Sequence, residues 1–578
     1  MDKKSYCIAW LMLLFVGSLH AQYRTTTYCN PLNLDYTYPF HNSHLGKSYR
    51  SAADPAVVEF RGEYYMFVTR SWGYWHSKDL LNWDFITPEK WYFEGCNAPA
   101  AHNYKDSVLY VCGNPSGAMS ILYTDNPKRG DWKAVPSVLH DLQDPALFID
   151  DDERAYMYWG SSNRWPIRGK ELDMKNKFLP IAKKPDSLLF LRPDIHGWER
   201  FGENHTSDIK PFIEGAWMTK HNGKYYLQYA APGTQFNVYG DGVYVGKSPL
   251  GPFEYAAHNP FCYKPGGFAT GAGHGSTVCG PGGIYWHFGT IHLSINYKFE
   301  RRLCMFPTFF DEDGAMYSDT YFGDYPHYSP DQVSRQTTSG GFRGWMLLSY
   351  GKPVKASSQL ESYPVENVTD ENLKTFWVAE KNDDKQWVEI DLEEVSDVYA
   401  LQLNFFDYEE TGFWGRMPNL RQRYLVEASV DGARWRVLVD YRNSFRDAPH
   451  NYIELDQPIE ARYIRYRHHY VPGKNLAMGD IRVFGLGRGK KPATVKGFTV
   501  VREADERNAR ISWKAVKGAQ GYNVLWGVAL DKLYSSWMVY GDNSLDLRAL
   551  TVGQKYYFAI EAFNENGISQ RVFLREAH

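Results

Sequence analysis

Hydrophobic and polar residues alternate over short runs through most of the chain, and turn-forming residues separate the runs. Tyr, Val, Phe and Trp are abundant in the runs, whereas Gly, Pro, Asn and Asp lie between them. Alternation with a period of two is typical of β-strands, and long segments with a helical period are hard to find. The pattern therefore predicts an all-β protein.

Five of these strand-like runs resemble one another. Each follows a polar turn and carries tyrosine at a similar place, and they are EYYMFVTRS (63–71), DSVLYVCGN (106–114), RAYMYWGSS (154–162), GKYYLQYAA (223–231) and GGIYWHFGT (282–290). A unit of several short strands that recurs at intervals of about 45 to 70 residues is typical of propeller blades. Five copies predict a five-bladed β-propeller around a central cavity.

Two breaks in the strand pattern divide the chain into domains. Residues 326–347 lose the pattern and contain much Ser, Thr and Gly, and a second break is the Gly- and Lys-rich stretch at 485–492. Segments of these sizes suit separate domains. We expect a signal peptide at 1–21, the propeller at 22–325, a linker at 326–347, a β-sandwich at 348–487 and another at 492–578.

The first residues have the features of an export signal. In MDKKSYCIAWLMLLFVGSLHAQ, two lysines precede an apolar run that ends in a small-residue cleavage pattern. This arrangement predicts a secretory signal peptide that is cut after Ala21. The apolar run is too short for a confident membrane span. We therefore expect a periplasmic or secreted protein with no membrane span after signal removal.

Charge and cysteine content narrow the function further. The formal net charge is -3, and a nucleic-acid partner would require a basic face. The aromatic content of 16% suits packing in β-sheets and also stacking on sugar rings. Six cysteines follow the signal without CxxC spacing, which argues against a zinc site. In an exported protein these cysteines can form disulfides or stay as buried free thiols, and the sequence does not decide between the two.

Three acidic residues occupy equivalent places in the repeats. Asp54-Pro55-Ala56 precedes the first run, Asp144-Pro145-Ala146 precedes the third, and Glu214 precedes the fourth. The innermost strand of a blade starts near the propeller axis, so acids at these starts converge on one pocket. A lone Asp-Pro is usually a turn and a lone Glu is usually solvated, but three acids in phase with repeats favour a catalytic trio.

Such a trio suits hydrolysis of a glycosidic bond. One protonated carboxyl donates to the leaving oxygen, and one ionised carboxylate takes a proton from water on the opposite face of the sugar. The third carboxyl tunes the acid, because a nearby like charge raises a pKa toward neutrality.

Residues 30 to 325 resemble glycoside hydrolase family 43, whose members are inverting enzymes with a five-bladed β-propeller. The motifs that carry the resemblance are ADPAVVEFRGEYYMF, HSKDLLNW, QDPALFIDDDERAYMYWG, IEGAWMTKHNGKYYLQY and GAGHGSTV. The resemblance implies that Asp54 is the general base and Glu214 the general acid. It also implies that Asp144 raises the pKa of the acid and orients it.

Three more residues are substrate-binding candidates. By resemblance, His274 lies beneath the active site and binds a water or, in some members, a calcium ion; a structural role is the alternative. Arg301 matches an arginine that reaches the bound sugar, although Glu300 stands where the family usually has glycine. Trp72 is a candidate pocket wall, against ordinary blade packing. We expect no required cofactor and leave a structural calcium ion open.

The two C-terminal segments resemble known β-sandwich domains. Residues 350 to 486 alternate as strands and resemble the discoidin (factor 5/8 type C) family, whose bacterial members often bind sugars; a spacer that packs on the propeller is the alternative. Residues 492 to 578 resemble a fibronectin type III domain, with Trp513 and Tyr522 in the core and Tyr556 as a tyrosine corner. A spacer or a docking surface is the expected role there.

The resemblance implies an exo-acting α-L-arabinofuranosidase or β-D-xylosidase on plant glycans. An endo-acting arabinanase or xylanase is a second option. A retaining five-bladed fructan hydrolase is a third, against which the missing Asn-Asp-Pro-Asn-Gly entry counts. A non-catalytic glycan-binding or adhesion protein is the alternative from another class, and it has no use for a buried proton donor.

Overall fold

The computed structural model confirms the all-β expectation. It describes residues 25–42, 46–90, 96–114, 118–140, 142–182, 184–333 and 340–574. Helical structure in these ranges is limited to the 3-10 turns Met174–Asn176, Gly197–Glu199, Glu203–His205, Pro281–Gly283 and Val365–Val368. The expected signal peptide at 1–21 lies outside the described residues. Within them, no helix has both the length and the apolar character needed to cross a bilayer.

Five antiparallel sheets follow one another along the first half of the chain, and each forms one propeller blade. Blade 1 contains β4 (Ala56–Phe60), β5 (Glu63–Phe67), β6 (Tyr74–Ser77) and β7 (Trp83–Ile86). Blade 2 contains β8 (Asn97–Tyr104), β9 (Val108–Asn114), β10 (Ala118–Thr124) and β11 (Lys133–His140). Blade 3 contains β12 (Ala146–Ile149), β13 (Ala155–Trp159), β14 (Ile167–Asp173), β15 (Leu179–Pro180) and β16 (Asp186–Leu189). Blade 4 contains β17 (Glu214–His221), β18 (Lys224–Ala231), β19 (Gly240–Gly246) and β20 (Phe253–Tyr255). Blade 5 contains β21 (Gly271–Cys279), β22 (Tyr285–His292), β23 (Arg301–Phe310) and β24 (Met316–Ser318).

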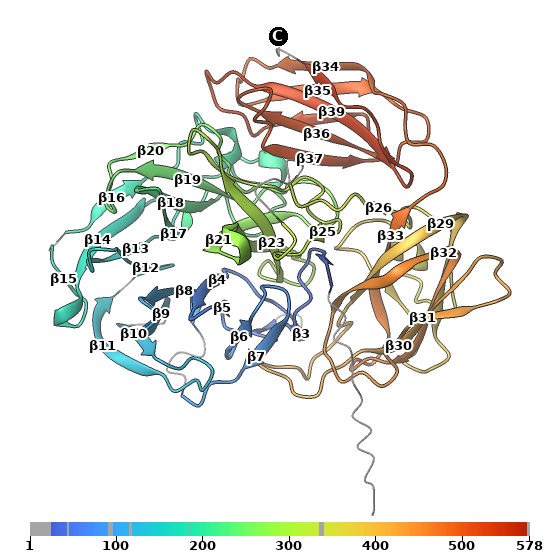
Figure 1. The fold of residues 1–578 in the computed structure, drawn as a ribbon, viewed down its shortest axis with the longest axis horizontal. Coiled ribbons are helices and arrows are strands. Elements are labelled where there is room, and N and C mark those ends of the chain that lie inside the picture. The colour runs from blue at the N-terminus through green and yellow to red at the C-terminus, as the bar shows by residue number, and fades with distance from the viewer. Residues whose placement is uncertain are drawn as a thin grey trace, which may run out of the picture.

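The first strands of the five blades form a closed ring. Strand β4 contacts β8, β8 contacts β12, β12 contacts β17, β17 contacts β21, and β21 contacts β4. Figure 1 shows these strands facing the middle of the propeller, with the later strands of each blade further out. The beginnings of the first strands therefore share one end of the propeller axis. We call that end of the propeller the active face, because the three acidic residues predicted to be catalytic lie there.

Short strands before and after the blades complete the propeller. Strand β1 (Thr27–Tyr28) pairs with β25 (His327–Tyr328), and β2 (Phe40–Asn42) pairs with β3 (Lys47–Tyr49). The expected linker at 326–347 thus contains β25 and also β26 (Met346–Leu347), which pairs with the following domain. These pairings satisfy backbone hydrogen bonds that an open linker would give to water.

The middle domain is built on one large sheet with the strand order β26-β33-β29-β32-β30-β31. Its strands are β27 (Val354–Ala356), β28 (Trp377–Val378), β29 (Trp387–Phe405), β30 (Arg423–Ser429), β31 (Arg436–Asp440), β32 (His450–Tyr470) and β33 (Ala477–Leu486). The long strands β29 and β32 change register at bulges, which lets one strand bend along the domain.

The last domain is a sandwich of two antiparallel sheets. One sheet contains β34 (Lys496–Arg502), β35 (Ala509–Lys514) and β38 (Ser544–Leu547). The other contains β36 (Gly521–Gly527), β37 (Ser535–Tyr540), β39 (Tyr557–Asn564), β40 (Gly567–Ile568) and β41 (Val572–Leu574). Alternate residues of β34 and β35 are buried, as a sheet with one solvent-facing side requires, whereas β36 and β39 are buried along almost their whole length.

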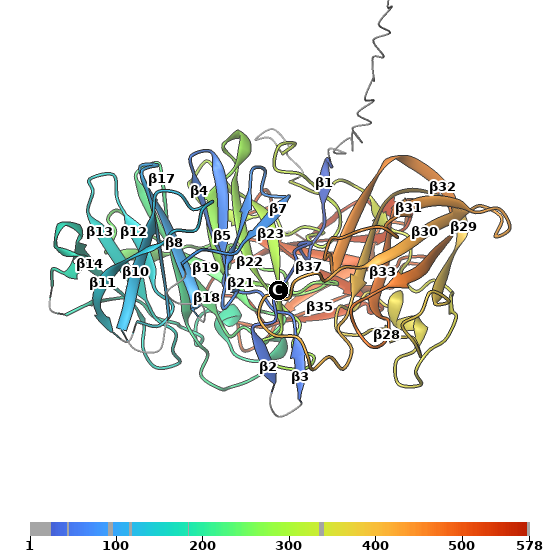
Figure 2. The same cartoon turned by 90° about the horizontal axis from the view of Figure 1, so that it is seen from below.

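Both C-terminal domains pack directly on the propeller (Figure 2). Arg482 of β33 is fully buried, pairs with Glu371 at 2.7 Å and donates to the backbone oxygen of Asp324 at 2.5 Å. In the last domain, the Tyr534 ring stacks on Tyr317 of blade 5 with 3.7 Å between ring centroids. The contacts fix both domains relative to the blades.

Candidate active site

The three acids singled out from the sequence lie at the starts of first strands. Asp54 precedes β4 by two residues, Asp144 precedes β12 by two residues, and Glu214 opens β17. These strands belong to three different blades of the closed ring. The fold therefore brings together acids that are far apart in the sequence, at the active face.

His274 of β21 lies between the carboxylates. Its Nδ1 is 3.3 Å from Asp54 Oδ1 and 3.8 Å from Asp144 Oδ2. Burial lowers the pKa of this imidazole, but the negative charges of Asp54, Asp144, Glu214 and Asp241 outweigh burial and raise the pKa above its usual range. The surrounding carboxylates therefore favour the protonated form of His274, which lies between Asp54 and Asp144.

Asp54 is held as an ionised carboxylate. Only 7% of its surface is exposed, and burial raises its pKa, but Arg301, His274 and a hydrogen bond from the Thr69 hydroxyl together lower it below its usual range. Arg301 Nη1 lies 3.4 Å from Asp54 Oδ1. The backbone N–H of Asp54 also donates to the Thr290 hydroxyl at 3.0 Å. An ionised, fixed carboxylate of this kind is able to accept a proton from water.

Two hydroxyl groups orient Glu214. Ser161 Oγ donates to Glu214 Oε2 at 3.0 Å, and the Tyr239 hydroxyl donates to Glu214 Oε1 at 2.6 Å. Tyr239 is fully buried, so its ring fixes the hydroxyl in one place. Both oxygens of Glu214 are thus held in place by hydrogen bonds.

Asp144 retains a proton near neutral pH. Burial raises its pKa to about 7, and the neighbouring charges of Glu214 and Asp54 add to this, while His274 and a hydrogen bond from Ser161 oppose it. The site therefore contains one carboxylate that is ionised and one carboxyl that titrates close to neutrality. The environment therefore shifts the pKa values of two carboxyls in opposite directions, as is common where charged groups cluster in a functional site.

The backbone at the start of every first strand has an unusual conformation. The φ angles are 56° at Asp54, 44° at Ala98, 48° at Asp144, 65° at Gly215 and 49° at His274. Four of these five residues are not glycine, so the left-handed conformation is sterically unfavourable for them. Strain of this kind collects at functional sites, where it directs side chains that regular strands would point elsewhere.

Several residues that support the site were missed in the sequence. Thr69, Ser161 and Thr290 lie at the ends of three of the five similar runs, and that shared position was the available signal. Asp241 is fully buried and accepts hydrogen bonds from the backbone N–H groups of His274 and Gly275 at 2.7 and 2.9 Å. No local pattern marks Asp241, because its partners lie on another blade.

The neighbouring arginines of β23 have different partners. Arg301 is 5% exposed and lies 3.4 Å from Asp54 Oδ1 and 3.3 Å from Thr234 Oγ1. Arg302 Nε donates instead to His450 Nε2 of the middle domain at 2.8 Å. Of the two arginines, Arg301 is thus the one that reaches the acids.

Trp72 lies at the edge of the active face. It follows β5 in the same loop as Thr69, whose hydroxyl bonds to Asp54. Its indole packs against Gly415 of the middle domain, where an added Cβ would lie 3.1 Å from Trp72 Cε2. Trp72 is therefore at a contact between two domains as well as near the acids.

The calcium expectation near His274 stays a prediction. The described ranges contain no group of three or more His, Cys, Asp or Glu residues arranged to hold a metal ion. The Nδ1 atom of His274 faces Asp54 instead. No disulfide joins the six cysteines within these ranges.

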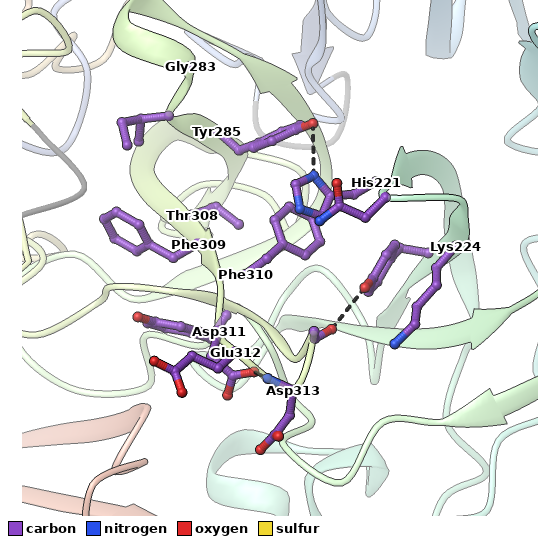
Figure 3. A pocket seen from close by; sticks show the side chains of 15 residues that line it. His221, Lys224, Gly283, Tyr285, Thr308, Phe309, Phe310, Asp311, Glu312 and Asp313 are labelled. Atoms are coloured by element: carbon purple, nitrogen blue, oxygen red, sulfur yellow. Dashed lines mark hydrogen bonds between the residues drawn. The ribbon is translucent and has the colours of Figure 1, made fainter.

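A cavity of about 520 Å³ lies at the opposite end of blades 4 and 5 (Figure 3). It is lined by His221 and Phe310, which end the strands that Glu214 and Arg301 begin. The His221 ring stacks on Phe310 at 3.9 Å and contacts the hydroxyl of Tyr285. The aromatic rings around the cavity pack on one another, so we assign it a structural role between the blades.

Two parts of the chain match the models of known protein families. The model of glycosyl hydrolases family 43 matches residues 49–316, and that of the F5/8 type C domain matches residues 353–478. A β-xylosidase of Xylanibacter ruminicola is 33% identical over 202 residues, which are 31% of this chain and 57% of the relative. An arabinoxylan arabinofuranohydrolase of Bacillus subtilis is 25% identical over 331 residues, 46% of this chain and 60% of the relative.

A non-reducing end α-L-arabinofuranosidase of Bacteroides ovatus is 25% identical over 289 residues, 45% of this chain and 50% of the relative. The match covers at most 60% of the length of any of these three relatives. The matched residues 49–316 include all three acids, His274 and Arg301. Residues 49–316 are therefore similar to glycosyl hydrolases family 43, and residues 353–478 are similar to the F5/8 type C domain.

Proposed function

We propose that the protein is a secreted inverting glycoside hydrolase that removes terminal α-L-arabinofuranosyl or β-D-xylosyl residues from plant polysaccharides or oligosaccharides. The observation that carries the proposal is the convergence of Asp54, Asp144 and Glu214 from three blades around His274. The names of the relatives, which include a β-xylosidase and a non-reducing end α-L-arabinofuranosidase, support the two sugars.

In this proposal Asp54 is the general base. Its lowered pKa keeps it ionised across neutral pH, so it accepts a proton from the water that attacks the anomeric carbon. Arg301 and His274 keep the carboxylate charged between turnovers. Arg301 also has a buried Nε with no hydrogen-bond partner in the described structure, which suits a donor to a sugar hydroxyl.

Glu214 is the general acid of the proposal. It donates its proton to the glycosidic oxygen as the bond to the anomeric carbon breaks, so the leaving sugar departs as an alcohol. Ser161 and Tyr239 hold both carboxyl oxygens in the orientation this requires. The charge of Glu214 contributes to the raised pKa of Asp144, so Asp144 lies close enough to the acid to interact with it electrostatically. Asp144 is thus the modulator of the acid.

The other expectations extend the proposal beyond the acids. Trp72, His274 and Arg301 contribute to substrate binding, no cofactor takes part, and a structural calcium ion is an addition still to be tested. We propose glycan binding for the F5/8 type C domain. We also propose a fibronectin type III identity for residues 492–578, because the backbone N–H of Thr551 donates to the Tyr556 hydroxyl at 3.2 Å, as in a tyrosine corner.

The test is release of 4-nitrophenol from 4-nitrophenyl α-L-arabinofuranoside and β-D-xyloside. Asp54→Asn should lower kcat by about three orders of magnitude while the protein stays folded. Glu214→Gln should do the same on an oligosaccharide, whose alcohol leaving group needs a proton, and should have a much smaller effect on the 4-nitrophenyl glycosides. Proton NMR of the first sugar released should show the anomer opposite to that of the substrate. A retained anomer would contradict inversion, and no turnover on these substrates or on arabinan and xylan would contradict the hydrolase.

A further inference from the structure

A loop of the F5/8 type C domain lies against the active face of the propeller. Residues 407–417, which we call the 407–417 loop, are part of the segment that joins β29 to β30 and are held at both ends. At one end Asp407 pairs with Arg50 at 3.0 Å. At the other end Gly415 and Tyr38 exchange two backbone hydrogen bonds of 2.8 and 2.9 Å. Because Arg50 is four residues before Asp54, the loop is held next to the strand that carries the proposed base.

Side-chain contacts fix the same loop more firmly. Lys47 of β3 pairs with Glu409 at 2.7 Å. Arg416 bonds to the Asp35 carboxylate, and its guanidinium lies 4.1 Å from the centre of the Phe85 ring of blade 1. The loop is therefore a fixed part of the propeller surface and not a free end of a separate domain.

The loop meets the site through Trp72. An added Cβ at Gly415 would lie 3.1 Å from Trp72 Cε2, so backbone and indole are in direct contact. Trp72 in turn belongs to the loop of Thr69, which hydrogen-bonds Asp54. A short chain of contacts thus connects the second domain to the acids.

The next residue along, Trp414, presents a large apolar surface. It is 48% exposed, although the loop around it is fixed by the contacts above. Thr411 and Gly412 at the tip are exposed as well. A large ring that is half exposed on a fixed support is well suited to contact a ligand.

We propose that the 407–417 loop and Trp72 form one wall of the substrate site on its leaving-group side, where Trp414 stacks on a sugar ring next to the bond that is cleaved. The inference rests on the proposed hydrolase function and deepens it. In this proposal the three acids at the propeller axis hold the terminal sugar. A wall at the edge of the active face then contacts the remaining sugars of the substrate. The apolar faces of sugar rings pack on indoles while their hydroxyls stay hydrated, which fits a half-exposed tryptophan.

The experiment compares two substrates that end in the same sugar, a methyl glycoside and a tetrasaccharide, because only the second has sugars on the leaving side. For Trp414→Ala, the ratio of kcat/KM for the tetrasaccharide to that for the methyl glycoside should fall about 10-fold relative to the wild type. Trp414→Phe, which keeps an aromatic ring, should retain most of the wild-type ratio. The control Phe573→Ala removes a 50% exposed ring of the last domain and should leave the ratio unchanged.

An unchanged ratio in a folded Trp414→Ala protein would overturn the proposal. Gly415→Ala provides a second variant, because its added Cβ would push against Trp72 and should also lower the ratio. A titration of the Glu214→Gln protein with the tetrasaccharide gives an independent reading. Adding Trp414→Ala should weaken that binding about 10-fold, and equal binding would again overturn the proposal. Failure of the wild type to cleave either substrate would contradict the hydrolase function, while the titration would still decide on the loop.

Discussion

Arg301 and Arg302 are neighbours on β23 with partners in different places, one at the active site and the other in the next domain. Arg301 Nη1 lies 3.4 Å from Asp54 Oδ1, whereas Arg302 Nε donates to His450 Nε2. Successive side chains of a strand point to opposite faces, so a single strand joins the catalytic centre to the domain interface. Substitution of each arginine in turn therefore tests the two roles separately, Arg301 in catalysis and Arg302 in stability.

Arg301→Ala should change the pH dependence of activity. Arg301 is one of the groups that lower the pKa of Asp54, so its removal raises that pKa. The acidic limb of the kcat/KM profile, which follows ionisation of the base, should therefore move to higher pH. The measurement is kcat/KM between pH 4 and 8 for the variant and the wild type. A limb at the wild-type position would contradict the role of Arg301.

Arg302→Ala should mainly lower stability. Its guanidinium is buried and bonds to His450 and to the backbone oxygens of Arg50 and Arg301. Removal leaves His450 Nε2 and the backbone oxygen of Arg50 without this buried donor, at a cost of about 2 to 4 kcal/mol in the free energy of unfolding. Denaturant unfolding of the variant, with the Arg301→Ala protein beside it, measures the difference. A larger loss for Arg301→Ala would be the contrary result.

Gly215→Ala should disturb His274. An added Cβ would lie 2.7 Å from His274 Cγ, and the φ of 65° is already unfavourable for alanine. We expect kcat to fall at least about 10-fold, because the imidazole that binds the acids is displaced. Gly223→Ala is the matched control, since its φ is 75° but nothing lies within 4 Å of the added Cβ. Equal activity of the two variants would show that the contact is unimportant.

Asp241→Asn should lower activity by changing the position of His274. Asp241 accepts from the backbone N–H groups of His274 and Gly275, and its other contact is His287 Nε2 at 3.2 Å. An amide offers only one accepting oxygen, so one of these buried partners is lost, at a cost of about 3 kcal/mol. We expect lower kcat with little change in KM. Asp152→Asn, in an exposed turn of blade 3, is the control and should match the wild type.

Asp144 should make stability fall as pH rises toward neutrality. Its pKa is about 7 in the folded protein, above the ordinary value of 3.8, so the folded state binds the proton more tightly than the unfolded state. Stability from this group is therefore full below pH 4 and is lost as pH rises through 7. Relative to Asp144→Asn, the wild type should lose about 3 to 4 kcal/mol over that range. Unfolding of both proteins at pH 4.5, 6 and 8 tests the sign, and a constant difference would contradict it.

The sequence by itself determined the strands and the repeat. Alternation with a period of two, tyrosines at matching places and acids in phase with the runs were enough to predict five blades with Asp54, Asp144 and Glu214 at their starts. These features are local, because side-chain period and turn residues act over a few positions. Arg301 was selected differently, from the resemblance of its motif to that of a known family.

The tertiary structure decided what surrounds the acids. Tyr239 and Asp241 reach the site from segments whose own sequences carry no mark of it. The contact of Gly415 with Trp72 joins residues that are more than half the chain apart. Ring closure of the blades and docking of the second domain create these neighbours, and both depend on packing between distant surfaces. A pattern along the chain reports what each segment buries, but only packing selects the partner that covers it.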